Sequence, residues 1–274
     1  MTDVITIARL EFVSAARLKW IRLLTLAFAL LAAAAAYSAG AATELAGPDG
    51  FARTTMTLVP VAMILIPLAA IVLGISGQSL ETGSESFLFG QPIGRVAILT
   101  GRWSGQLAAL GGAIAIGFGI GAAAVAAAAG VDGLGGFVAF VAASIALAAI
   151  FLSIAAAIAA SSGTRAAALG IGVFAWFFCA LLYDGIALSI AGWLTGSTGG
   201  RLLFASVFGN PADLVRVVIL MASGTANVLG AAGEAWVRFL GGESAAMVAA
   251  ASAVALWIGG PLAVAAAALH ARDL

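Results

Sequence analysis

Six long apolar segments constrain the fold of this chain more than any other feature of its sequence. Each holds about twenty or more mostly apolar residues, enough for an α-helix rising about 1.5 Å per residue to cross a hydrocarbon core of about 30 Å. Helices are expected because open strands and loops leave backbone polar groups unpaired in lipid. The predicted spans are residues 23–42, 56–77, 104–130, 134–160, 166–192 and 245–269. The sequence therefore predicts an all-α membrane protein with six transmembrane helices.

The composition agrees with a lipid environment. The 274 residues are 63% hydrophobic and 9% charged, whereas a soluble domain is about 45–50% apolar and about 25% charged. The formal net charge is +0, so nucleic acid is not an expected partner. Cys179 and His270 are the single cysteine and histidine. No intrachain disulfide can form, and no metal site is predicted.

Arginine and lysine predict the orientation of the spans, because cytoplasmic loops carry an excess of both. The tail before the first span is basic, and placing it inside puts most other basic residues inside as well. The inner set is then Arg9, Arg17, Lys19, Arg22, Arg95, Arg102, Arg165 and Arg272, and the outer set is Arg53, Arg201, Arg216 and Arg238. We therefore expect a multi-pass protein of the bacterial inner membrane with both termini in the cytoplasm.

Residues 1–22 are predicted to form an N-terminal helix on the surface of the inner leaflet. Apolar positions fall near one helical face, and basic positions lie between them. The apolar face comprises Ile5, Ala8, Phe12, Ala16 and Trp20. This pattern is typical of an interfacial helix bound to the lipid bilayer. The alternative is a solvated basic tail.

Small residues are frequent in the third to fifth spans. Gly117 and Gly121 stand four apart, the spacing at which two helix backbones approach closely in lipid. Close helix packing or dimerisation is one interpretation. The other is chance, since the chain contains 35 glycines.

Two connections are longer than the turns that usually join helices, and function is expected there. One is the inner loop 78–103 and the other is the outer region 193–244. The inner loop reads QSLETGSESFLFGQPIGRVAILTGRW. Its first part is predicted to form a short helix that ends before Pro92 and Gly94. The apolar knob Phe87–Phe89 on such a helix suits a groove on a partner protein.

This loop resembles the segment between the second and third spans of ABC-2 exporter permeases. The matching elements are Glu81, Gly83-Ser84, Phe87-Leu88-Phe89, Pro92, Arg95 and Ile98-Leu99-Thr100-Gly101-Arg102. The resemblance implies a single permease domain over residues 1–274, with the ABC-2 (type V exporter-like) fold, working as two copies. It also implies that the loop is a coupling helix that docks on an ATPase subunit. The expected coupling residues are Glu81, Gly83, Glu85, Phe87, Leu88, Phe89, Pro92 and Arg95. The alternative is a membrane-surface loop with ordinary turn residues.

The chain has no phosphate-binding loop of its own. Such a loop needs Gly-Lys-Ser/Thr, and the only lysine, Lys19, stands between Leu18 and Trp20. We therefore expect a non-catalytic permease subunit without a cofactor, and ATP and Mg²⁺ on a separate ATPase subunit.

The outer region has a recognisable order of features. Residues 196–200 are rich in glycine and expected to be flexible, residues 202–208 are apolar enough for the membrane interface, and Asn210-Pro211 begins a predicted helix. Asp213 and Arg216 stand three apart on its polar side.

This order, together with the N-terminal IARLEF, resembles the membrane subunits of the transporters that mature nitrous oxide reductase. In the N-terminal pattern Leu10 replaces a lysine. The resemblance implies export or signalling to a periplasmic copper-delivery accessory protein, for the copper–sulfur centre of the reductase. The expected contacts are Asn210, Pro211, Asp213 and Arg216. The alternative is a general ABC-2 exporter of a drug, lipid or polysaccharide.

Two other classes of protein fit less well. A membrane protease of the rhomboid kind needs a histidine inside the bundle, and His270 lies four residues from the C-terminus. A secondary transporter needs ionisable groups within its spans, and Asp184 is the one acid that we place inside a span. We expect Asp184 near the outer membrane interface rather than in a proton relay.

Overall fold

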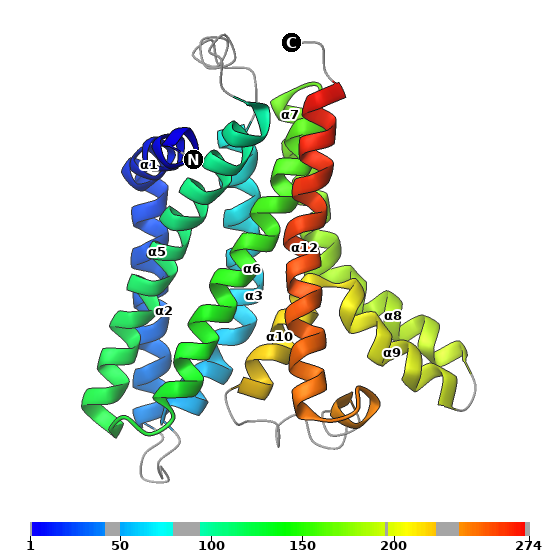
Figure 1. The fold of residues 1–274 in the computed structure, drawn as a ribbon. Helices are drawn as coiled ribbons and strands as arrows, with labels where there is room; N and C mark the ends of the chain where they lie inside the picture. Colours follow the sequence, from blue (N-terminus) through cyan, green and yellow to red (C-terminus); the bar gives the residue numbers. More distant parts are fainter. Residues whose placement is uncertain (1, 42–49, 79–93, 195–196, 223–235, 272–274) are drawn as a thin grey trace.

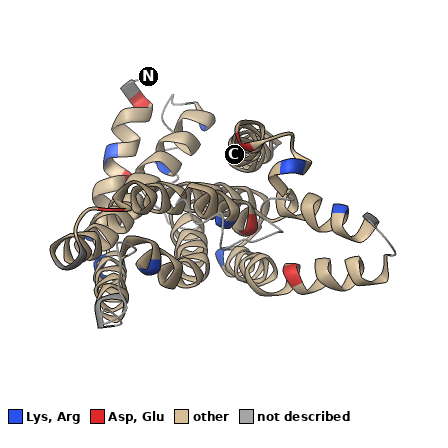
Figure 2. Ribbon diagram, turned by 90° about the horizontal axis from the view of Figure 1, so that it is seen from below, with Lys and Arg blue, Asp and Glu red and all other residues tan. Residues whose placement is uncertain are grey.

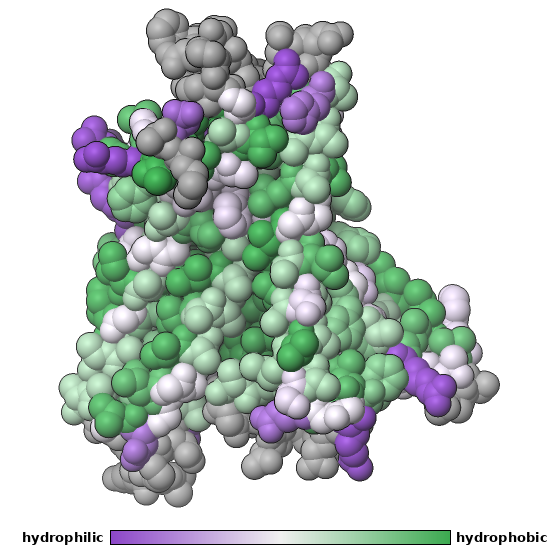
Figure 3. Space-filling view, in the orientation of Figure 1, coloured by the Kyte–Doolittle hydropathy of each residue, from purple (hydrophilic) through white to green (hydrophobic). Residues whose placement is uncertain are grey.

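The computed structural model describes residues 2–41, 50–78, 94–194, 197–222 and 236–271, and the regular structure in these residues is helical. Long helices stand side by side in one bundle, and the N-terminal helix and the C-terminus lie at the same end (Figure 1). We call this the terminal end and the opposite one the far end. On the face drawn in Figure 3, hydrophilic residues gather at the two ends and apolar residues cover the middle.

Among the described residues, six helices are long and apolar enough to cross a membrane, which confirms the predicted spans. They are α2 (Lys19–Ala41), α3 (Gly50–Gln78), α5 (Arg95–Ala129), α6 (Leu134–Ser161), the continuous run α7–η2–α8 (Arg165–Trp193) and α12 (Glu243–Ala271). Viewed from the far end, charged residues are few along these helices (Figure 2). The all-α fold class predicted from the sequence is confirmed.

The third span begins earlier than the sequence analysis expected. Residues 95–103 were assigned to the inner loop, but they form the first turns of α5. No proline occurs between Arg95 and Trp103, and four successive apolar residues follow Arg95. Their burial begins at Ile98 and Leu99, so packing favours helix here.

The core of the bundle lies along α3 and α6. Five phenylalanine rings form a continuous row of contacts through it, from α2 and α3 to α5 and α6. They are Phe28, Phe118, Phe140, Phe137 and Phe51, with centroid separations of 5.0–5.6 Å. Because apolar burial does not distinguish helix from lipid, this close packing is what selects one arrangement of the helices.

Gly117 and Gly121 let α5 lie directly against α2. A β-carbon at Gly117 would collide with Phe28, and one at Gly121 would collide with Ala32. The glycine spacing in this span therefore serves close packing within the chain.

The N-terminal helix α1 (Thr2–Arg17) packs across α5. Its buried residues are Ile7 and Ala15, whereas Ile5 and Phe12 of the predicted apolar face are exposed. The predicted lipid contact concerns this exposed face and stays a prediction. The sequence pattern did not reveal the second face, which contacts protein.

Two shorter helices, α9 (Ser197–Gly209) and α10 (Pro211–Ala222), meet at a bend of 99°. Helix α1 and the last turn of α12 lie at the same end of the bundle, which fits the six described crossings, and the bent pair enters and leaves at the far end as a re-entrant element (Figure 1). The expected flexibility of residues 197–200 is wrong, because they form the first turn of α9. Gly199 allows that turn to lie against the carbonyl of Ala191 in α8.

Candidate coupling end and mid-membrane polar network

The predicted coupling helix falls in residues 79–93, outside the described part of the chain, but both of its anchors are described. The segment leaves α3 at Gln78 and enters α5 at Arg95. The predicted coupling residues that lie outside the described part of the chain are Glu81, Gly83, Glu85, Phe87, Leu88, Phe89 and Pro92. What the structure defines is the pair of helices that this segment connects, α3 and α5.

At the terminal end, three arginines in the first turns of α5 and α7 bond to residues in the last turns of α12 and α3. Arg95 Nη1 donates to the Leu269 oxygen in α12 at 2.6 Å, and Arg102 Nη1 donates to the Gly77 oxygen in α3 at 3.1 Å. Arg165 Nη2, at the start of α7, donates to Ser76 Oγ at 2.9 Å. The last carbonyls of a helix lack partners in their own helix and carry partial negative charge. Guanidinium groups therefore suit the Leu269 and Gly77 carbonyls, and the three contacts together join α3, α5, α7 and α12.

A fourth contact fixes α1 to the same group. Gln106 of α5 is fully buried, and its Nε2 donates to Glu11 Oε1 at 2.9 Å. Three glycines leave room for this crossing, since β-carbons at Gly77, Gly101 and Gly105 would meet Gln106 or α1. The sequence analysis missed the crossing, although the four-residue spacing of Gly101 and Gly105 is the same signal that it noted at Gly117.

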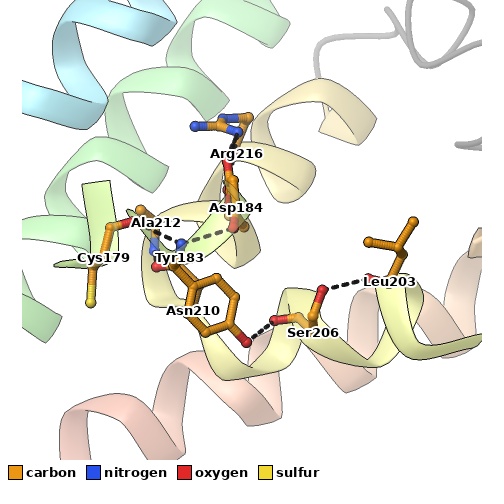
Figure 4. Close-up of polar contacts among 9 residues, drawn as sticks. Cys179, Tyr183, Asp184, Leu203, Ser206, Asn210, Ala212 and Arg216 are labelled. Atoms are coloured by element: carbon orange, nitrogen blue, oxygen red, sulfur yellow. Dashed lines mark hydrogen bonds and ion pairs between the residues drawn. The ribbon is translucent and has the colours of Figure 1, made fainter. Parts of the chain in front are cut away.

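A polar network surrounds the bend between α9 and α10 (Figure 4). Asn210 is buried at the bend. Its Nδ2 donates to the Cys179 oxygen at 2.9 Å and to Asp213 Oδ2 at 2.8 Å, while its Oδ1 accepts from the Ala212 amide at 3.1 Å. Asn210 thus caps α10 in the usual manner of asparagine and also fixes the bend to another helix.

The network lies near the middle of the bundle. Cys179 stands midway between Arg165 and Trp193 in its span. Trp257 stands midway along α12, and its Nε1 donates to the Phe208 oxygen, next to the bend, at 3.0 Å. The bend is therefore held at mid-height from both sides, so the re-entrant pair reaches about half-way through the bundle.

The span that faces the bend is itself irregular. Residues Phe178–Leu182 form a π-helical turn, in which the Tyr183 amide donates to the oxygen of Phe178, five residues back. The Tyr183 hydroxyl donates to the Ser206 oxygen in α9 at 2.9 Å. Single π-turns inside α-helices often mark functional positions.

Two carboxylates share one guanidinium in this network. Arg216 Nη1 lies 3.0 Å from Asp213 Oδ1 and 3.3 Å from Asp184 Oδ2. The side chains of Asp213, Arg216 and Asp184 are 14%, 39% and 53% exposed. Asp213 and Arg216, placed three apart on the polar side of a helix by the sequence analysis, form an ion pair, and Arg216 also pairs with Asp184.

Comparison with known proteins agrees with this architecture. The family model described as ABC-2 family transporter protein matches residues 5–274. The chain belongs to the ABC-2 transporter family. It is 33% identical over 227 residues to the probable ABC transporter permease protein NosY of Pseudomonas aeruginosa strain PAO1, a match covering 80% of this chain and 82% of that protein. A protein of the same description from Stutzerimonas stutzeri is 30% identical over the same shares.

Family membership confirms the sequence-based recognition and makes the chain an ABC-2 permease subunit of an ABC transporter. Such a subunit works with an ATPase, in keeping with a non-catalytic role of its own. Within the described ranges, no group of three or more His, Cys, Asp or Glu side chains is placed to hold a metal ion.

The four residues predicted to touch a periplasmic partner mainly make contacts within the permease. Asn210 and Pro211 are buried, because Asn210 caps α10 and bonds to α7–η2–α8. Asp213 is largely covered, which leaves Arg216 with the most exposed side chain of the four. Contact of these four residues with such a partner stays a prediction.

Proposed function

We propose that this permease takes up energy from ATP hydrolysed on a separate ATPase subunit through residues 81–95, and passes the resulting movement to its far end. The observation that supports this most directly is the set of ties at the terminal end. Arg95, Arg102 and Arg165 bond to α12, α3 and Ser76, so a pull on the 79–93 connection acts on four spans at once.

A continuous route leads from there to the mid-membrane network. Trp176 Nε1 of α7 donates to the Ile64 oxygen, midway along α3, at 3.0 Å. The π-turn that follows Trp176 carries Cys179, whose oxygen holds Asn210 at the bend. A shift of α3 against α7 therefore reaches the re-entrant pair, which opens toward the far end.

In this proposal the terminal end is cytoplasmic, as the arginine and lysine distribution predicts. The ATPase subunit holds ATP and Mg²⁺, and Glu81, Gly83, Glu85, Phe87, Leu88, Phe89 and Pro92 form the docking surface. Two copies of the chain complete the transporter in the bacterial inner membrane.

The proposed biological role is export or signalling in the maturation of the copper–sulfur centre of nitrous oxide reductase, through a periplasmic copper-delivery accessory protein. Two similar proteins carry the description NosY, and the N-terminal and Asn-Pro motifs support the same assignment. A host strain that lacks this gene should make nitrous oxide reductase with a reduced copper content. Full copper content in that strain would exclude this role and favour a general ABC-2 exporter.

The coupling step is tested with Leu88→Glu in the complete transporter. A charge in the apolar knob should leave membrane insertion intact but abolish co-purification of the ATPase. Val131→Glu, an equivalent change in the exposed turn between α5 and α6 at the far end, is the matched control and should retain the ATPase. Retention of the ATPase by an inserted Leu88→Glu protein would contradict the proposal.

A further inference from the structure

The mid-membrane network contains more acid than base. Asp184 and Asp213 both pair with the one guanidinium of Arg216, so two negative charges face one positive charge when both carboxyl groups are ionised. Charged groups at this depth are costly in lipid and are found paired. On the described residues, the network is therefore one positive charge short.

The two carboxyl groups also lie close to each other. One oxygen of each is near the same nitrogen, Arg216 Nη1, at 3.0 Å for Asp213 and 3.3 Å for Asp184, and the two side chains are in hydrogen-bonding contact. Ionised carboxylates offer only acceptor oxygens and repel each other, whereas a protonated carboxyl group can donate to an ionised one. A single proton between them therefore satisfies this contact.

Asp213 is the better place for that proton. Its side chain is 14% exposed, against 53% for Asp184, and burial disfavours the ionised form of a carboxyl group. Asp213 Oδ1 is buried and accepts no aligned hydrogen bond from the described residues, although Arg216 Nη1 is near. The aligned hydrogen bond of Arg216 goes to Asp184 Oδ2 instead. The negative charge is thus best placed on Asp184 and the proton on Asp213.

The other helices that pack against α10 do not supply the missing charge within the described ranges. Cys179 and Tyr183 also face the two acids, but a thiol and a phenol carry no positive charge in any form. Helix α6 contains no charged or titratable residue. Those of α3, α9 and α12 stand in a first or last turn or, in α9, nine residues before the bend at Asn210, and they are Arg53, Glu243, His270 and Arg201.

A metal ion suits this position less well than a proton. The guanidinium of Arg216 lies near an oxygen of each carboxyl group and would repel a second cation there. Hard cations such as Ca²⁺ also take about six to eight oxygen ligands, and the described residues hold no group of three or more His, Cys, Asp or Glu suited to a metal. A proton needs only the two carboxyl oxygens.

We propose that the mid-membrane network binds one proton, held by Asp213 and shared with the carboxylate of Asp184. The proton comes from water that reaches the partly exposed Asp184, and with it the network is neutral. Ionisation of Asp213 would place two negative charges in contact between α8 and α10, so the proton also helps to hold the bend against the fifth span. This site goes beyond the proposed function and does not depend on it.

Infrared spectroscopy of the full-length permease in lipid membranes tests the site at neutral pH. The wild-type protein should show the C=O stretching band of a protonated carboxyl group, which shifts in heavy water. Asp213→Asn should abolish the band. Asp184→Asn should abolish it too, because Asp213 then ionises beside Arg216 in a neutral pair. Retention of the band in either variant would overturn the shared proton.

The matched control is Asp132→Asn, in the exposed turn between α5 and α6, which should retain the band. Isotopic labelling covers the case in which the network variants fail to insert. In the wild-type permease, aspartate labelled at its side-chain carboxyl carbon should move the band to lower frequency, and glutamate labelled in the same way should not. A wild-type spectrum without the band, or a band that moves only with labelled glutamate, would overturn the proposal.

Discussion

The two polar sites of this permease differ in how they hold the chain. At the terminal end, arginines bond to the last turns of regular helices, and one buried glutamine fixes α1. In the mid-membrane network, hydrogen bonds and ion pairs gather where the backbone is irregular, at the π-turn and the 99° bend. The first site joins the ends of intact helices to one another. The second joins the two places where helices are already interrupted.

The largest effect is expected at the shared guanidinium. Arg216→Leu leaves Asp184 and Asp213 without their cation, and should lower the free energy of unfolding by about 3 kcal/mol, at the low end of the range for a broken buried pair because Arg216 is partly exposed. Asp184→Leu leaves the Asp213–Arg216 pair intact and should cost about 1 kcal/mol or less. Denaturant unfolding in detergent measures both. Equal losses would show that the network does not depend on its charges.

The next effect tests the bend. Asn210→Leu removes the cap of α10 and the bond to the Cys179 oxygen, and should cost about 2 kcal/mol. Ser206→Ala is the matched control, because its hydroxyl bonds to Leu203 within its own helix, and should cost about 0.5 kcal/mol or less. The same unfolding experiment applies. An Asn210→Leu variant with an unchanged free energy of unfolding would show that the bend does not stabilise the structure.

A third change distinguishes the terminal end from an ordinary helix surface. Gly105→Ala places a β-carbon against α1 and should destabilise the protein by about 1–2 kcal/mol. Gly119→Ala, on the same helix with open space around it, should stabilise it by up to about 1 kcal/mol. Opposite signs in thermal unfolding are the expected result, and a stabilising Gly105→Ala would show that α1 is not fixed there.

The smallest effect on stability falls on Arg95. Arg95→Gln should cost about 1 kcal/mol, since it removes one hydrogen bond to the carbonyl of Leu269 in the last turns of α12. Under the proposed coupling route it should nevertheless reduce the stimulation of the ATPase by the permease. Arg22→Gln, which loses a bond to Arg17 of the preceding helix, should leave stimulation unchanged. Unaltered stimulation of the ATPase by the Arg95→Gln permease would show that Arg95 is not part of the proposed coupling route.

The same contrast explains which features of the fold and the site could be predicted from the sequence. Membrane spans follow from local composition, and the motif around Arg95 is contiguous, so both were predictable. The contacts of the mid-membrane network join residues far apart in the chain, such as Arg216 with Asp184 and Asn210 with Cys179. No local pattern marked the π-turn at Phe178–Leu182. Asn210 was singled out, but only three-dimensional packing shows that it faces inward.

The central claim is that events at residues 81–95 move the far end through the mid-membrane network. A spin label on Trp193→Cys, in a Cys179→Ala background, reports the distance between the far ends of α8 in the two copies. ATP binding to the complete transporter should shift this distance distribution, and ATP added to membranes that contain the ATPase and the Leu88→Glu permease should leave it unchanged. An unchanged distribution in the transporter with the native Leu88 would contradict the account. The same shift in the Leu88→Glu protein would contradict it as well.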